Sequence, residues 1–195
     1  NESSKIVDLR IDENSIYIKC RPLDWAKSAE YITPSYMEAT YSLENSLVFV
    51  SCRFVDFSGY DAVYTTQELP AFYCIEPFNS FVYYKGGELH REDNLIFWPD
   101  AGYPNFTSDE HWAAFVGENE DSFGIGLYAP NETNFLAGVY AREKTDSSNP
   151  AKAAPTSYIA LVKYMTFESF KPIEYDFCLT TGNTEEIRAN FSSIE

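Results

Sequence analysis

The stretch MEATYSLENSLVFVSCRFVDF, residues 37–57, holds two alternating runs of apolar and polar residues separated by a short polar break. Every second residue from Met37 to Leu43 is apolar, and the same holds from Val48 to Phe54. A period of two is the period of a β-strand with one buried face. The break at Glu44–Ser46 therefore predicts the turn of a β-hairpin.

The same period recurs outward from this hairpin through most of the chain. It appears upstream in SIYIKC and downstream in AFYCI, FVYY, HWAAFV, FGIGLY, NFLAGVYA, YIALVKY and IEYDFCLTTG. Many short strands separated by turn residues are typical of an antiparallel β-sandwich. The sequence therefore predicts an all-β fold, a large antiparallel β-sandwich, as a single domain over residues 1–195.

Three segments depart from the strand pattern. Asn183 with Glu186 three residues later has the form of a capping box, which predicts a short C-terminal helix over TEEIRANF. The segment DWAKSAEYI, residues 24–32, fits either a short helix or a loop, and the proline that follows limits its length. Residues 142–157 are polar and contain two prolines, so we expect an exposed, mobile loop there.

Composition restricts the classes of partner. The formal net charge of −16 repels phosphate backbones and anionic lipid surfaces, so nucleic acid and membranes are poor partners. The sequence contains no apolar run that approaches the ~20 residues of a membrane span. Aromatic residues make up 17% of the chain. Most rings of a sheet protein belong to its core, but a surplus of Tyr and Trp is also what a sugar-binding surface uses.

The four cysteines show no C-x-x-C spacing of a zinc or redox site. They are Cys20, Cys52, Cys74 and Cys178, all in strand-like apolar surroundings. We expect small, buried and mostly unpaired side chains, although an oxidising compartment leaves two disulfides open in any of three pairings. The chain also lacks a P-loop, a G-x-S-x-G and an H-E-x-x-H motif. The sequence therefore indicates no metal and no cofactor.

Arg53 is the first candidate site residue, because it projects from a strand face that is otherwise largely apolar. It is either paired with a neighbouring acid or presents its guanidinium fork to a carboxylate or a sugar hydroxyl. Asp56 follows at the end of the same strand. If the chain turns between Tyr64 and Pro70, we expect Arg53, Asp56 and Glu68 to converge.

Gln67 and Glu68 place an amide and a carboxylate inside the aromatic stretch TTQELPAFY, residues 65–73. They are either part of a polar turn or part of a site. A carboxylate held among aromatic rings can act as a general acid or base, as in glycosidases. His111, beside a tryptophan at a strand start, is the better of the two histidines for proton transfer or ligand contact.

A second candidate site involves the glycines of FGIGLY. Gly124 and Gly126 alternate on one strand and leave a flat trough, over which Trp112 of the partner strand can lie. The trough is either filled within the sheet or open to a ligand. In the second case, Trp98, Trp112 and Tyr128 line a sugar groove.

Several segments carry a resemblance to a known group of proteins. They are RPLDWA, SYMEATYSL, RFVDFSG, QELPAFY, HWAAFV with FGIGLYAP, FLAGVY and EYDFCLTTGNTEEIR. Over nearly its whole length, the chain resembles largely uncharacterised bacterial secreted all-β proteins associated with polysaccharide degradation. The resemblance implies a sandwich of the galactose-mutarotase type and the C-terminal part of a longer chain. Arg53, Asp56, Gln67 and Glu68 match its signature segments, but it supplies no reaction.

Three hypotheses of function follow for this secreted or cell-surface sandwich. The first is a carbohydrate-binding or accessory module with an oligosaccharide or polysaccharide as partner, which an exposed row of Trp and Tyr favours. The second is a glycoside-processing enzyme that uses Glu68 with Arg53 or His111, which requires a second converging carboxylate. The third is a structural module that packs on an upstream domain of the same chain, which an exposed apolar patch near the N-terminus favours.

Overall fold

A computed structural model describes residues 4–24, 32–75, 77–85, 95–98, 105–140 and 156–194. These residues form two β-sheets and one short helix, which confirms the predicted all-β sandwich with a C-terminal helix. The sheets have nine strands, in the order β1-β2-β3-β4-β13-β10-β9-β6-β7, and four strands, in the order β5-β12-β11-β8. The expected mobile loop falls outside the described residues up to 155, and DWAKSAEYI falls outside them except for its two end residues.

The bounds of the elements are β1 Lys5–Ile11, β2 Ser15–Arg21, β3 Ser35–Glu44, β4 Leu47–Asp56, β5 Val63–Ile75, β6 Ser80–Tyr84, β7 Leu95–Trp98, β8 Asn105–Thr107, β9 Trp112–Val116, β10 Gly124–Tyr128, β11 Asn134–Tyr140, β12 Thr156–Phe167, β13 Ile173–Gly182 and α2 Thr184–Ser192. The chain divides into two compact units. The first comprises Asn1–Thr66 and Tyr164–Phe177, and the second comprises Gln67–Lys163 and Cys178–Glu195.

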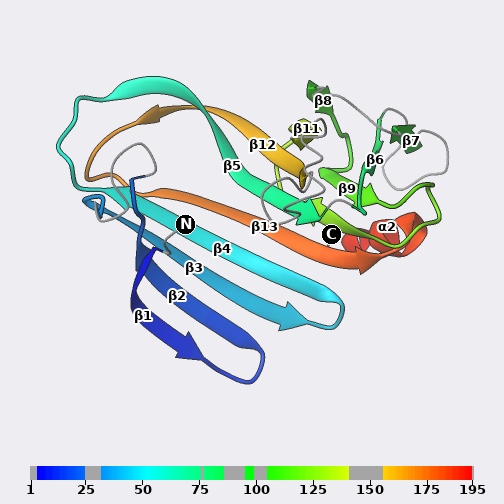
Figure 1. Ribbon diagram of the computed structural model, residues 1–195, viewed down its shortest axis with the longest axis horizontal. Helices are drawn as coiled ribbons and strands as arrows, with labels where there is room; N and C mark the ends of the chain where they lie inside the picture. The colour runs from blue at the N-terminus through cyan, green and yellow to red at the C-terminus, as the bar shows by residue number, and fades with distance from the viewer. Residues whose placement is uncertain are drawn as a thin grey trace, which may run out of the picture. The chain divides into compact units, whose positions relative to one another are not determined.

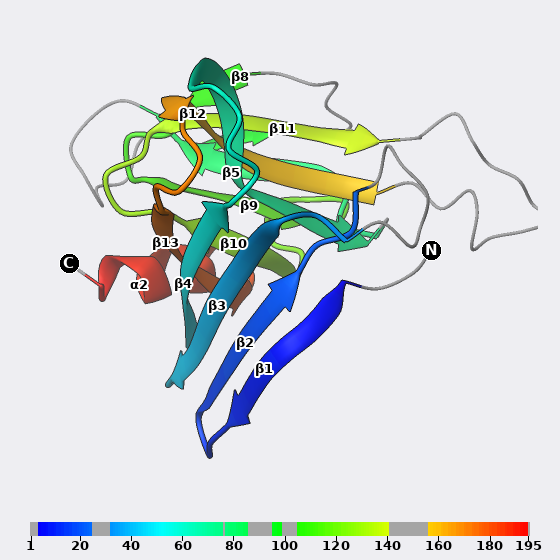
Figure 2. The ribbon, with the colours of Figure 1, turned by 90° about the vertical axis from the view of Figure 1, so that its left-hand side faces the viewer.

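The first unit contains β1 to β4 as successive antiparallel strands, which lie side by side in Figures 1 and 2. The hairpin predicted from residues 37–57 is β3 and β4, joined by a turn at Asn45 and Ser46. Asn45 has a φ of 54°, the left-handed conformation that tight hairpin turns require. This turn sets the register of the pair, so that Glu44 lies opposite Leu47.

The second unit holds most of the apolar core. Every residue of β6 and β9 is buried, so the alternation expected for FVYY and HWAAFV is wrong: both faces of these strands are covered, and SFVYY and WAAFV are nearly continuous apolar runs. Phe81 and Phe115 are fully buried and pack edge to face with ring centroids 5.9 Å apart. The core of this unit is therefore built from strands that are covered on both faces.

Helix α2 ends the second unit and confirms the predicted capping box. The Asn183 side chain accepts a hydrogen bond of 2.9 Å from the backbone amide of Glu186, and the Glu186 carboxylate accepts one of 2.9 Å from the amide of Asn183. Ile187 and Phe191 form the buried face of the helix.

All four cysteines lie on strands, as expected, and all are free thiols. Cys178 is buried as expected, but Cys20, Cys52 and Cys74 are partly exposed, so the expectation of burial is wrong for these three. Burial raises the pKa of the Cys74 thiol to about 12.

Candidate functional site

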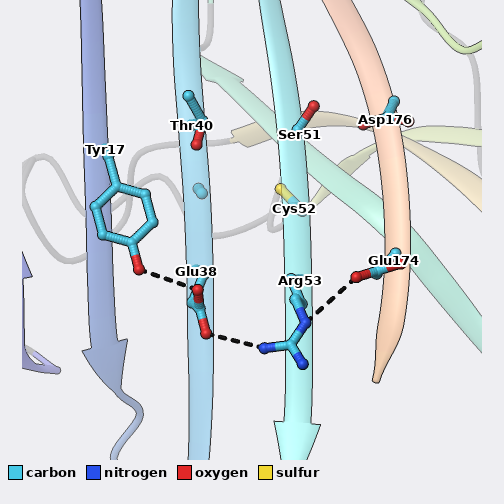
Figure 3. Close-up of a pocket in the computed structure, with 9 residues that line it drawn as sticks. Tyr17, Glu38, Thr40, Ser51, Cys52, Arg53, Glu174 and Asp176 are labelled. Atoms are coloured by element: carbon cyan, nitrogen blue, oxygen red, sulfur yellow. Dashed lines mark hydrogen bonds and ion pairs between the residues drawn. The ribbon is translucent and has the colours of Figure 1, made fainter. Parts of the chain in front are cut away.

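A pocket of about 320 Å³ lies on one face of the sheet in the first unit (Figure 3). Its polar lining residues come from four strands and are Tyr17, Glu38, Thr40, Ser51, Arg53, Glu174 and Asp176. We call these seven residues the polar pocket. Its volume is at the lower end of the ~300–1,000 Å³ of small-molecule sites.

Cross-strand register brings these side chains together. Glu38 lies opposite Arg53 and Thr40 opposite Ser51 in the β3–β4 pair, and Tyr17 of β2 lies opposite Thr40. Residues directly opposite each other in a sheet share a face. Alternation alone predicts the face on which Arg53 lies, but Glu38 was not among the predicted site residues. The signal was present, because a two-residue turn at Asn45 and Ser46 makes Glu38 the direct partner of Arg53.

Glu38 is the centre of the hydrogen bonding in the polar pocket. Its carboxylate accepts a hydrogen bond of 3.0 Å from the Tyr17 hydroxyl and forms ion pairs of 3.0 Å with Lys19 and 3.2 Å with Arg53. Burial raises the pKa of the Glu38 carboxyl, but the hydrogen bonds from Lys19 and Tyr17 and the charges of Lys19 and Arg53 lower it by more. The net pKa lies below its ordinary value, so Glu38 is an ionised acceptor at neutral pH and not a general acid.

Arg53 joins the two sides of the pocket. Its Nη1 lies 3.2 Å from the Glu38 carboxylate, and its Nε lies 3.3 Å from the carboxylate of Glu174 on β13. Figure 3 shows the guanidinium between these two acids. The side chain of Glu174 is 67% exposed, so one of the two pairs is open to solvent. Of the two alternatives for Arg53, the structure shows the ion pair with neighbouring acids. These acids are Glu38 and Glu174, not the Asp56 and Glu68 that we expected to converge with it.

The formal charge of this surface is slightly negative. Glu38, Glu174 and Asp176 carry three negative charges, and Arg53 with the adjoining Lys19 carries two positive charges. A net charge of this sign disfavours an anionic ligand. The hydroxyls of Tyr17, Thr40 and Ser51 add donors and acceptors that suit a neutral, hydroxyl-rich molecule.

Asp56 is buried and does not line the polar pocket. Only 6% of its surface is exposed, and its carboxylate accepts hydrogen bonds from the hydroxyls of Ser35 (3.0 Å), Ser169 (2.6 Å) and Ser58. Burial raises the pKa of the Asp56 carboxyl, but the hydrogen bonds from Ser169, Ser58 and Ser35 outweigh it, and the net pKa lies below its ordinary value. Asp56 therefore organises structure rather than contacting a ligand.

Gln67 and Glu68 lie within β5, which runs without a turn from Val63 to Ile75. The turn between Tyr64 and Pro70 that we considered is therefore wrong. Gln67 is partly buried and Glu68 is exposed, as expected for neighbours on opposite faces of a strand. The convergence of Glu68 with Arg53 and Asp56 stays a prediction. The observed partners of Arg53 and of Asp56 lie within the first unit.

His111 and Tyr128 lie together in the second unit, with ring centroids 6.4 Å apart. His111 adopts a φ of 61°, and its Nδ1 lies 2.8 Å from the backbone carbonyl oxygen of Glu132. Because a carbonyl oxygen only accepts, Nδ1 carries the donated hydrogen. The side chain of Glu132 in turn pairs with Lys163 at 2.7 Å.

The expected sugar groove of Trp98, Trp112 and Tyr128 is not what the structure shows. Trp112 is fully buried and Tyr128 is 6% exposed, and both rings contact Phe191 of helix α2. Trp98 is 40% exposed and packs against a different ring, that of Phe81. The two buried rings belong to the core, which leaves Trp98 as the exposed member of the set.

Helix α2 covers the strand at Gly126, whereas a Cβ at Gly124 would meet Phe115 and Val116 of β9. A Cβ at Gly126 would lie 2.6 Å from Ile187 Cγ2 and 2.7 Å from Phe191 Cε2. The glycine is therefore required for the close approach of the helix, and the space that we considered for a ligand is occupied by these two side chains.

Within the described part of the chain, no three His, Cys, Asp or Glu side chains are grouped so that they could hold a metal ion. The helix that the structure describes is too short and too polar to cross a membrane.

No protein-family model matches the chain, and no curated protein matches it either. Solved structures do match. The chain aligns over 92% of its length with 68% of a candidate aldose 1-epimerase from Escherichia coli, at 8% identity and a TM-score of 0.57. It aligns over 91% of its length with 25% of the galactosidase domain of an α-galactosidase–sucrose kinase, at 12% identity and a TM-score of 0.58.

A third match is a GH36 α-galactosidase variant from Geobacillus stearothermophilus in complex with stachyose. It covers 94% of this chain and 26% of that chain, at 10% identity and a TM-score of 0.55. At such identities the likeness shows the fold alone, and it supports the expected sandwich of the galactose-mutarotase type. The chain spans about a quarter of the length of these galactosidase chains.

Proposed function

We propose that this chain is a secreted or cell-surface carbohydrate-binding or accessory module whose polar pocket holds a neutral sugar. The observation that carries the proposal is the fixed, ionised carboxylate of Glu38, held by Tyr17, Lys19 and Arg53 within a pocket of about 320 Å³. An ionised carboxylate beside a guanidinium offers strong acceptors and donors to sugar hydroxyls. The fold likeness to an aldose 1-epimerase candidate and to galactosidase domains adds support.

The geometry favours binding over acid–base catalysis. A glycosidase needs one carboxylic acid with a raised pKa to protonate the leaving group. The pKa of Glu38 is shifted downward instead, and Glu68 is an exposed residue of β5. The polar pocket therefore supplies hydrogen-bond acceptors and a cation without supplying the proton donor that glycoside cleavage requires.

A glycan array that includes neutral and uronic-acid glycans of plant and host origin tests the proposal. We expect the wild type to bind neutral glycans and to bind uronic-acid glycans more weakly, because the pocket carries a net negative charge. Arg53→Leu should lose this binding. The matched control is Lys5→Leu, which removes an exposed cation of β1 that does not line the pocket. Absence of binding to every glycan on the array would overturn the proposal.

A second candidate function, a module that packs against another domain, is favoured by an apolar surface on the first unit. Seven large side chains on one face of β1, β2 and β3 are between 38% and 68% exposed. They are Ile6, Leu9, Ile11, Ile16, Met37, Tyr41 and Leu43. Exposed apolar areas of this kind mark interaction surfaces in many proteins.

The dye 8-anilinonaphthalene-1-sulfonate reports on this apolar face directly. We expect the wild type to raise its fluorescence and the double variant Ile11→Lys/Ile16→Glu to lower the signal, since these two exposed residues lie opposite each other. Glycan binding should be unchanged in the double variant. A wild type that binds no dye would remove the ground for this second candidate.

A further inference from the structure

Three aromatic rings form a cluster at one end of the sheet face that carries the polar pocket. Tyr36 and Phe57 pack edge to face with ring centroids 5.8 Å apart, and Phe57 and Phe170 do so at 6.0 Å. Phe57 is 47% exposed and Phe170 is 63% exposed. We call Tyr36, Phe57 and Phe170 the aromatic cluster. Because the two exposed rings are in contact, they form a contiguous apolar patch, the kind of surface that marks interaction sites.

The aromatic cluster and the polar pocket adjoin each other. Tyr36 precedes Glu38 by two residues on β3, so both side chains project from the same face about 7 Å apart. Lys19 joins the two directly, because its Nζ lies 3.0 Å from the Glu38 carboxylate and 4.9 Å from the centre of the Tyr36 ring. The polar surface therefore continues into an aromatic one without an intervening element.

Buried Asp56 holds the exposed rings of the cluster in place. Its backbone oxygen accepts a hydrogen bond of 2.7 Å from the amide of Phe170, and its carboxylate binds the hydroxyl of Ser169 at 2.6 Å. The same carboxylate accepts from the backbone amide of Ser58, next to Phe57. One buried residue thus fixes both turns from which the exposed rings project.

The backbone conformation of Phe170 also indicates a binding site. Its φ of 68° is in the left-handed region, which favours glycine and is strained for a bulky residue. The cluster presents an exposed phenylalanine at a position where glycine would fit with less strain. Residues kept in such conformations concentrate at binding sites.

We propose that the polar pocket and the aromatic cluster form one extended site for a neutral oligosaccharide of two or more rings. The pocket binds the hydroxyls of one sugar, and Phe57 and Phe170 pack against the apolar face of the next. This inference rests on the proposed function and adds the length of the ligand to it. Asp56 is a positioning residue in this site, because it acts through the two turns that it holds.

Calorimetric titration with sugars of graded length tests the inference. The single-ring probes are galactose and glucose, and the four-ring probes are stachyose and cellotetraose. The test variant is Phe170→Gly, which removes the ring and suits the left-handed backbone, so the unit should stay folded. Phe57→Ala serves as a second variant, and thermal melts check the folding of each. The matched control is Tyr164→Ala, an aromatic residue on β12 that is 69% exposed and not a member of the cluster.

We expect the wild type to bind at least one four-ring probe about tenfold more tightly than the single ring of the same series. Phe170→Gly should abolish this gain in affinity and leave single-ring affinity unchanged. The control Tyr164→Ala should keep the gain. Equal affinity for one ring and four, or a gain that survives in Phe170→Gly and Phe57→Ala, would overturn the inference and leave the proposed function standing. Failure of both four-ring probes to bind would also overturn it, while the array result decides the proposed function separately.

Discussion

Asp56 carries the densest set of hydrogen bonds around the aromatic cluster, and its ionisation should be visible in the stability of the protein. Its folded-state pKa lies below the ordinary value, after burial is outweighed by the serine hydroxyls. For a lowered carboxyl pKa, the stabilisation is fully present above the unfolded pKa of about 3.9 and is lost as pH falls through the folded pKa. The free energy of unfolding thus depends on Asp56 most clearly at neutral pH.

Asp56→Asn tests this dependence. We expect the variant to be less stable than the wild type by about 1–3 kcal/mol between pH 5 and pH 7, since charged acceptors make the stronger hydrogen bonds. The difference should shrink below about pH 4, where the wild-type carboxyl becomes protonated. Urea denaturation at a series of pH values measures it. A difference that grows in acid would mean that the Asp56 pKa is raised, not lowered.

Gly126 supports a second prediction for a single residue, because Ile187 and Phe191 occupy the space of a Cβ. Gly126→Ala should lower the free energy of unfolding by about 1–3 kcal/mol, as overpacking does. In a double-mutant cycle with Ile187→Ala, the combined loss should be less than the sum, because the smaller side chain makes room. Chemical denaturation supplies the four values. Strict additivity would show that the helix does not approach this strand closely.

Single residues also show how far the sequence could predict the site. Alternation placed Arg53 on the correct face, and the turn at Asn45 and Ser46 contained the register that makes Glu38 its partner. Glu174 could not be found in this way, because it comes to Arg53 through a strand pairing more than a hundred residues away in the chain. Trp112 was misread as a candidate for a groove, since periodicity reveals the face of a strand but not what covers it.

At the scale of elements, helix α2 is attached by a buried ion pair. The Glu110 carboxylate is fully buried and binds Arg188 through two hydrogen bonds, of 2.7 and 3.0 Å, and the Trp112 indole at 2.8 Å. The Arg188 guanidinium also lies 4.7 Å from the centre of the Tyr84 ring. The capping box predicted where this helix begins, but not this anchor, whose partners are 78 residues apart.

Arg188→Leu should destabilise the protein strongly, because it leaves the buried Glu110 carboxylate without its counter-ion. The expected loss is about 3–5 kcal/mol in the free energy of unfolding. Arg188→Lys is the matched control, since it keeps the charge but not the two-pronged geometry, and its loss should be smaller. Thermal and urea denaturation measure both. A Leu variant as stable as the wild type would show that the ion pair does not anchor α2.

At the scale of the whole molecule, the alternation that runs through the chain was sufficient to predict an all-β sandwich with one terminal helix. β6 and β9 carry the alternation least clearly, since both faces of these strands are buried. The net charge of −16 agrees with the choice of ligand. An acidic protein repels phosphorylated and uronic sugars but does not repel neutral ones. Site and charge therefore favour the same neutral class of ligand.

A crystal structure of the protein soaked with stachyose or cellotetraose would show directly whether a sugar binds in the polar pocket of the first unit. We expect one sugar ring in hydrogen-bond contact with Glu38 and Arg53, and a second against Phe57 or Phe170. A sugar that occupies the second unit instead, beside Glu68, His111 or Trp98, with the polar pocket empty, would contradict this expectation.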